Sequence, residues 1–344
     1  MLTSPAALVN TVTPAIGGTA EAGSTVTVTV DSRVVGTALA DGAGHWSLTP
    51  STALSQGAHA VSAAATDAAG NQGTSSADRA FTVDSVAPAV PVLTAPSVLV
   101  NSVTPTVAGT AEEGSSVVVW LDGVEVGTAR VEASGAWSLV LSSPLTDGSH
   151  EATAIATDAA GNTSARSVGR AFTVDSVAPE APELTGPAAL VNTVTPLIEG
   201  KAEPGSTVTV RLDGFAVGTA VTNASGAWSL RPGEPLAQGT STVTATATDA
   251  AGNTGAASMP RAFTVDSLAP AAPVLTAPAA RVGTTTPTFE GMAEAGSTVS
   301  VRLDGVDLGT ATANASGAWS FTPGAPVSRG QHWPPPSPPT PPAT

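Results

Sequence analysis

The side chains best suited to chemistry in this sequence are four histidines and a recurring set of carboxylates. The histidines are His45, His59, His150 and His332, and they occupy two positions of a repeating pattern. No Ser/His/Asp order, HExxH motif or phosphate-binding Gly-Lys loop accompanies them. We therefore interpret His59 and His150 as strand residues near a turn, and we expect no enzymatic activity.

The carboxylates recur within two short segments. Asp84, Asp175 and Asp266 each stand in the segment Phe-Thr-Val-Asp-Ser, and Asp158 and Asp249 each open the segment Asp-Ala-Ala-Gly-Asn. Carboxylate oxygens are ligands that calcium prefers. Whether these groups can act together depends on the elements that position them.

One repeat organises the whole chain. Trp46, Trp137, Trp228 and Trp319 each lie in a Gly-x-Trp-Ser context, and each follows the last by 91 residues. The acidic segments share this period, which indicates tandem duplication without insertions. We predict repeats at 1–87 (trimmed at its amino end), 88–178, 179–269 and 270–332 (incomplete), followed by a proline-rich tail at 333–344.

Composition and charge narrow the class of protein. The chain has 344 residues, of which 42% are hydrophobic and only 3% aromatic, so packed cores rich in Ala and Val are expected. The net charge of −15, with only 12 Lys and Arg, argues against a nucleic-acid partner. The absence of cysteine excludes disulfides. No apolar run is long enough for a transmembrane segment, and no signal peptide is visible.

The second copy illustrates the predicted strands. Alternating and β-branched stretches, bounded by Gly, Pro and Asp, predict short strands. Asp122-Gly123 is interpreted as a hairpin turn rather than a ligand. The predicted strands lie near 93–94 and at 104–111, 117–121, 126–129, 135–139, 151–157 and 171–174. About seven strands without a helical period predict an all-β fold, a tandem array of immunoglobulin-like β-sandwiches. Proline-rich junctions favour a stiff, elongated array.

The combined motif resembles a known family. Thr-Pro…Gly-Thr-Ala-Glu-x-Gly-Ser, Gly-x-Trp-Ser, Ala-Thr-Asp-Ala-Ala-Gly-Asn and Phe-Thr-Val-Asp together are similar to the bacterial immunoglobulin-like repeats of large surface proteins and adhesins. The resemblance covers nearly the whole chain. It implies an extracellular, stalk-like role in adhesion or surface attachment, and some relatives bind calcium between modules.

An immunoglobulin-like topology would bring carboxylates together at the module junctions. The second-to-third strand turn and the last hairpin loop lie at the end that receives the preceding module. One prediction is therefore interdomain calcium sites formed by Asp84, Glu112 and Asp158, and by Asp175, Glu203 and Asp249. The alternative is that the loop aspartate closes its own turn through side-chain hydrogen bonds. No cofactor is required in either case.

The two ends depart from the repeat. Leu2 aligns with Leu93, so Met1 takes the place of Val92 and the chain is expected to begin inside a module. The tail at 333–344, written in GC-rich codons with one inserted base, encodes the residues found at 152–162. We hypothesise a frameshifted repeat, which the nucleotide sequence tests. Copy four would then lack its last strands and have unpaired edges.

These observations predict a structural or adhesive repeat segment of a bacterial cell-surface or secreted protein, acting as a stalk or spacer. Its expected partners are the neighbouring repeats of a longer chain and an unidentified surface or matrix ligand. A carbohydrate- or ligand-binding module is an alternative, but it needs clustered exposed aromatics, and only Trp120 is expected to face outward. A spacer attached to an extracellular enzyme is another alternative. The recurrent Trp137 is expected in or beside the core.

Overall fold

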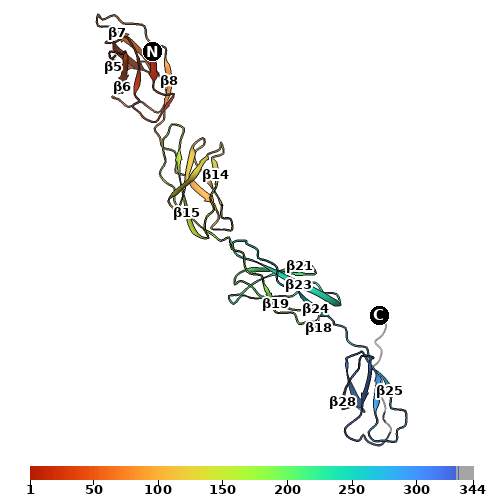
Figure 1. Ribbon diagram of the computed structural model, residues 1–344. Coiled ribbons are helices and arrows are strands. Elements are labelled where there is room, and N and C mark those ends of the chain that lie inside the picture. Colours follow the sequence, from red (N-terminus) through yellow and green to blue (C-terminus); the bar gives the residue numbers. More distant parts are fainter. Residues whose placement is uncertain (331, 333–344) are drawn as a thin grey trace, which may run out of the picture. The chain divides into compact units, whose positions relative to one another are not determined.

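The computed structural model describes residues 1–330 and 332, and it consists of β-strands joined by turns and loops (Figure 1). Within these residues, no helix has the length and apolar character needed to cross a membrane. The described chain divides into two compact units: Met1–Thr185 with Glu199–Leu230 and Thr244–Pro260, and Gly186–Ile198 with Arg231–Val243 and the described residues from Arg261 onward. The repeat boundaries expected from the sequence remain predictions, and the proposed frameshifted tail lies outside the described residues.

Each of the first three copies forms eight strands in the same order. In copy one these are β1 Leu2–Ser4, β2 Leu8–Val9, β3 Ile16–Thr19, β4 Thr25–Val30, β5 Arg33–Leu39, β6 His45–Leu48, β7 Gly57–Thr66 and β8 Arg79–Val83. In copy two they are β9 Val92–Ala95, β10 Leu99–Val100, β11 Thr106–Thr110, β12 Ser116–Leu121, β13 Val124–Arg130, β14 Ala136–Val140, β15 Gly148–Thr157 and β16 Arg170–Val174.

The later copies repeat this series. Copy three comprises β17 Glu183–Leu184, β18 Leu190–Val191, β19 Ile198–Lys201, β20 Thr207–Leu212, β21 Phe215–Val221, β22 Ala227–Leu230, β23 Gly239–Thr248 and β24 Arg261–Val265. Copy four comprises β25 Val274–Ala277, β26 Phe289–Met292, β27 Thr298–Leu303, β28 Val306–Thr312 and β29 Ala318–Phe321.

Two sheets build each sandwich. In copy two, β9, β11 and β14 form a three-stranded sheet, and the other sheet has the order β10-β16-β15-β12-β13. Copies one and three have the same arrangement. In the described part of copy four, β25-β26-β29 form one sheet and β27 pairs with β28 in the other. The all-β tandem sandwich predicted from the sequence is confirmed.

The sequence prediction omitted one short strand in each complete copy. Leu99 and Val100 form β10, which pairs in parallel with β16, so the first strand of the sandwich is split between the two sheets. The split occurs beside the cis Ala95–Pro96 peptide bond, and Arg170 Nε donates a hydrogen bond of 2.7 Å to the carbonyl of Pro96. A two-residue strand shows no readable alternation, which explains the omission.

The core lies between the sheets and follows the alternation of the strands. On β12, Val117, Val119 and Leu121 point inward and are almost fully buried. They pack with Phe172 of β16 and with Trp137 of β14, which is 3% exposed. The core position predicted for the recurrent tryptophan is therefore confirmed. Glycine at position 109 of β11 provides the space for the indole, because a Cβ there would lie 3.0 Å from Trp137 Cζ2.

Candidate functional site

The Asp-Ala-Ala-Gly-Asn segments form compact loops directly after β7, β15 and β23. In the second loop, the Asp158 carboxylate accepts two hydrogen bonds of 2.8 Å from Asn162, one from its main-chain nitrogen and one from its amide Nδ2. Gly161 adopts a φ of 91°, which favours glycine. The loop aspartate therefore closes its own turn, which was the structural alternative considered for this residue.

The same asparagine also contacts the preceding copy. Asn162 Nδ2 donates a hydrogen bond of 2.8 Å to the main-chain carbonyl of Asp84, the residue that follows β8. The next junction repeats the arrangement, since Asn253 Nδ2 donates at 2.7 Å to the carbonyl of Asp175. Both bonds lie within the first compact unit. An amide nitrogen has two protons, so one side chain can hold its own loop and the previous copy together.

The acceptor carbonyl is held in place by its own copy. The main-chain nitrogen of Asp84 donates to the carbonyl of Val9 at 2.9 Å, which extends the pairing of β2 with β8. The next residue, Ser85, is bound by Gln56: Gln56 Nε2 donates to Ser85 Oγ at 2.7 Å, and Ser85 N donates to Gln56 Oε1 at 2.9 Å. The beginning of the linker is therefore anchored to the loop between β6 and β7.

The structure places the predicted calcium ligands at the junctions but gives them separate partners. The Asp84 carboxylate accepts from Val86 N at 3.2 Å, while that of Asp158 accepts from its own loop. Glu112 lies in the turn between β11 and β12, where its carbonyl accepts from Ser115 Oγ at 2.6 Å. The pairing of Ser116 with Thr157 puts this turn and the loop at one end of the sheet.

The second predicted calcium set follows the same pattern. Asp249 accepts from Asn253, the Asp175 carboxylate accepts from Val177 N at 3.3 Å, and the Glu203 carbonyl accepts from Ser206 Oγ at 2.7 Å. Among residues 1–330 and 332, no group of three or more His, Asp or Glu side chains is arranged to hold a metal ion. Calcium binding at the junctions remains a prediction.

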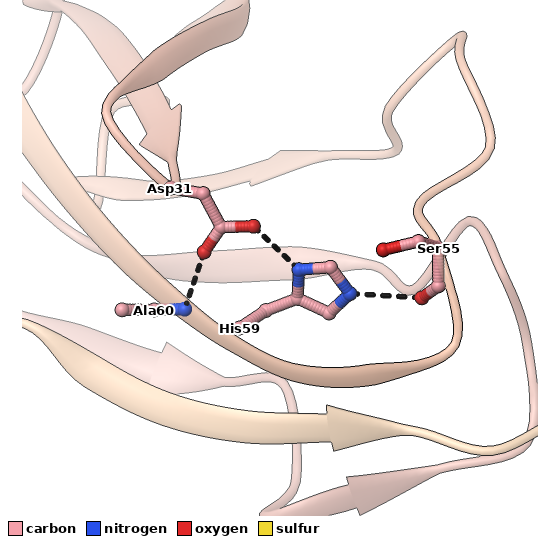
Figure 2. A network of polar contacts seen from close by, with 4 residues as sticks. All are labelled: Asp31, Ser55, His59 and Ala60. Atoms are coloured by element: carbon pink, nitrogen blue, oxygen red, sulfur yellow. Dashed lines mark hydrogen bonds and ion pairs between the residues drawn. The ribbon is translucent and has the colours of Figure 1, made fainter.

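The histidines form a second polar site, which sequence reasoning missed. Figure 2 shows the His59 ring between the Asp31 carboxylate and the carbonyl of Ser55. The Nδ1–Oδ2 distance is 2.6 Å and the Nε2–O distance is 2.8 Å. The other carboxylate oxygen, Oδ1, accepts from Ala60 N at 3.0 Å. The ring lies 5.5 Å from that of Phe81, and His59 is only 7% exposed.

The cluster recurs in two other copies. His150 pairs with Asp122 at 2.7 Å and with the carbonyl of Thr146 at 2.9 Å. His332 makes the equivalent contacts with Asp304 and Ser328. In each pair the histidine follows the aspartate by 28 residues, a recurring separation that could have revealed the contact from the sequence.

Each aspartate of a cluster also lies in a hairpin turn, which the sequence predicted for Asp122. Asp122 and Gly123 have φ values of 50° and 83°, as a two-residue turn with both central residues in the left-handed region requires. The turn therefore holds the Asp122 carboxylate beside strand β15, which carries its partner His150.

Hydrogen bonding and burial set the charge of the cluster. Burial alone would lower the pKa of His59, but the hydrogen bonds to Asp31 and Ser55 outweigh it, so this pKa is raised above 6.5. The hydrogen bond from the main chain of Ala60, followed by that from His59, lowers the pKa of Asp31 below 3.8. Both shifts favour an ion pair. Because the ring also binds the carbonyl of Ser55, the cluster holds the loop between β6 and β7 in place.

Trp120 is half-buried rather than fully exposed. The guanidinium of Arg166 lies 4.3 Å from the centre of its ring, and Arg166 Nη1 also donates to Thr153 Oγ1 at 2.8 Å. Arg166 therefore lies over the ring of Trp120 and links it to Thr153 of β15.

Comparison with known proteins gives a consistent family assignment. A family model described as a bacterial Ig-like domain matches residues 4–85, 96–176, 183–267 and 281–333. No curated protein matches the chain significantly.

The similarity to solved structures is low. One is a tetra-tandem repeat in the extending region of a large adhesion protein, with 24% identity, coverage of 92% of this chain and 89% of that chain, and a TM-score of 0.32. Another contains the fibronectin(III)-like modules of Clostridium thermocellum CbhA, with 14% identity, coverage of 51% and 94%, and a TM-score of 0.38.

Proposed function

Because the chain belongs to the bacterial Ig-like domain family, we propose that it is a stalk segment that separates other parts of a longer cell-surface or secreted protein. Its partners in this role are the neighbouring repeats. The observation that carries the proposal is the hydrogen bond from a loop asparagine to the main chain of the preceding copy, repeated at two successive junctions. Such bonds restrict bending between consecutive copies.

The strength of each junction bond can be placed on a scale. An intramolecular hydrogen bond stabilises a folded arrangement by about 0.5–1.5 kcal/mol net. At the upper end of that range, one such bond favours the hydrogen-bonded arrangement of a junction over the unbonded one about tenfold. This follows because 1.4 kcal/mol corresponds to a factor of about ten in an equilibrium constant. The proposed stalk requires only such a bias at each junction, not a rigid connection.

Small-angle X-ray scattering tests the stalk directly. A single compact globule of this length would have a radius of gyration of about 20 Å. We expect the full chain in solution to exceed this value well, with a concentration-independent profile. A radius near 20 Å would contradict a stalk.

A pulsed spin-label measurement tests the role of the asparagine. The chain contains no cysteine, so Val34→Cys and Val124→Cys, at positions 65% and 66% exposed, can carry labels in copies one and two. We expect a narrow distance distribution that broadens in Asn162→Ala. Asn71→Ala is the matched control, because Asn71 makes the same bonds to Asp67 but follows no other copy in this sequence. Equal broadening in both variants would show that the bond from Asn162 to the preceding copy does not cause the narrow distribution.

A further inference from the structure

The His59 cluster joins two segments that are distant in the sequence. The ring connects the hairpin turn between β4 and β5 with the loop between β6 and β7 (Figure 2). A carbonyl oxygen can only accept a hydrogen bond, so Nε2 must donate to Ser55. An ionised carboxylate likewise only accepts, so Nδ1 must donate to Asp31. Only the doubly protonated imidazolium satisfies both partners.

The loop held by His59 is the loop that anchors the linker. Ser55 precedes Gln56, whose side chain makes both hydrogen bonds to Ser85. Ser85 directly follows Asp84, the residue whose carbonyl accepts from Asn162 of the next copy. A continuous series of contacts therefore runs from the ring of His59 to the junction.

Copy two has the same connection with a different anchor. His150 Nε2 faces the carbonyl of Thr146, and the adjacent Asp147 accepts hydrogen bonds from Ser176 N at 2.9 Å and Ser176 Oγ at 2.8 Å. Ser176 follows Asp175, which is the acceptor at the second junction. The anchoring side chain differs between the copies, whereas the histidine bond to the loop is retained.

We propose that His59 and His150 are proton-dependent latches, in which the protonated ring holds the linker-anchoring loop and the loss of one ring proton releases it. This device goes beyond the stalk role, because it makes the attachment of each linker depend on pH. It does not require that the stalk function be correct.

The charges around the ring determine the direction of the effect. Of the groups packed against His59, Asp31 is charged, while Phe81 of β8 and the carbonyl of Ser55 are not. The pKa of His59 is raised by its hydrogen bonds despite burial, so its contribution is complete below 6.5 and is lost as pH rises through the raised value. The lowered pKa of Asp31 keeps its carboxylate ionised down to below 3.8. The latch therefore holds in mildly acidic solution and opens as the solution becomes alkaline.

Copy three provides a natural reference within the same chain. It has Ser241 at the position of His150, yet it retains the linker anchor, because Gln238 Nε2 donates to Ser267 Oγ at 2.7 Å and Ser267 N donates to Gln238 Oε1 at 2.9 Å. We expect this anchor to be insensitive to pH in the range where histidine titrates.

Histidine titration by NMR in the full chain tests the protonation state. The ordinary histidine pKa of 6.5 is the reference for both rings. We expect His59 and His150 to titrate above this value and to show slowly exchanging protons on both ring nitrogens at neutral pH. Titration of either ring at or below 6.5 would overturn the proposal for that copy.

Hydrogen exchange of the linker amides tests whether the histidine ring controls the attachment of the linker. We expect protection of the Ser85 and Ser176 amides, corrected for intrinsic exchange, to fall between pH of about 6 and about 9, by up to about tenfold for each unit by which the histidine pKa is raised. The Ser267 amide should not change in this way. In His59→Ser, protection at Ser85 should be low at both pH values while the core amides of β4 stay protected. A response at Ser267 equal to that at Ser85, or an unchanged Ser85 in His59→Ser, would overturn the proposal.

Discussion

Substitution of Gly200 by alanine should destabilise copy three strongly. Gly200 lies in β19, the middle strand of the sheet β17-β19-β22. A Cβ at this position would lie 2.2 Å from the carbonyl oxygen of Glu183 and 2.7 Å from Cζ2 of Trp228. Both distances are far shorter than a van der Waals contact. One obstacle is the main chain of the neighbouring strand, and the other is an indole that is only 5% exposed. Displacing either one would disrupt the close packing around it.

The expected loss follows from this geometry. Inserting a methyl group into a well-packed core costs about 1–3 kcal/mol, and two rigid obstacles place Gly200→Ala near the upper value. Hydrogen exchange of the full chain, followed on peptides from β20 and β23, measures the opening free energy of this copy separately from the others. We expect a decrease of about 3 kcal/mol in copy three and no change in copy one.

Gly233→Ala is the matched control within the same copy. A Cβ at Gly233 would meet no heavy atom within 4 Å, and its backbone conformation does not require glycine. Its substitution should change stability by less than about 0.5 kcal/mol. Equal effects of the two substitutions would refute the assignment of Gly200 as the space for the tryptophan.

Three further predictions concern side chains outside the core. Arg166→Ala should destabilise copy two by about 0.5–1 kcal/mol through loss of the stacking on Trp120, measured by exchange in β12; an unchanged value would contradict the stacking. Burial alone would raise the pKa of Asp158, but the hydrogen bonds from Asn162 outweigh it and lower this pKa below 3.8, so the loop should be stable above 3.8 and open as pH falls further. The NMR signals of the Asn162 amide group report this opening, and their persistence down to a pH of about 2 would argue against it. Calorimetric titration at about millimolar calcium should show binding that weakens in Asp84→Asn, and the absence of heat would reject junction calcium sites.

Much of the fold could be predicted because its signals are local and repeated. Alternation identifies β4, where Val26, Val28 and Val30 are buried and the threonines between them are not. The Asp-Gly pair identifies the hairpin between β12 and β13 through the backbone conformation that it favours. The two-residue strand β10 has no such signal, because its place is set by pairing with β16, more than seventy residues away.

The polar sites were less predictable because their partners are remote or belong to the main chain. The position of Asp158 at a junction could be inferred from topology, but nothing in the sequence indicates that its partner Asn162 also contacts the preceding copy. The acceptor at Asp84 is a main-chain carbonyl, which every residue has, so the sequence does not identify it. His59 is on β7 and Asp31 is in the turn between β4 and β5, and only their recurrent separation marks them as a pair.

The use of a main-chain acceptor at the junction bears on how such an array can change in length over evolutionary time. Every residue has a carbonyl, so the asparagine of one copy does not depend on the side chain that ends the preceding copy. Unequal recombination between similar copies can add or remove a repeat and still leave each new neighbour with a compatible contact. Copy number can thus vary without compensating mutations, and the length of the array becomes a heritable, easily adjusted quantity.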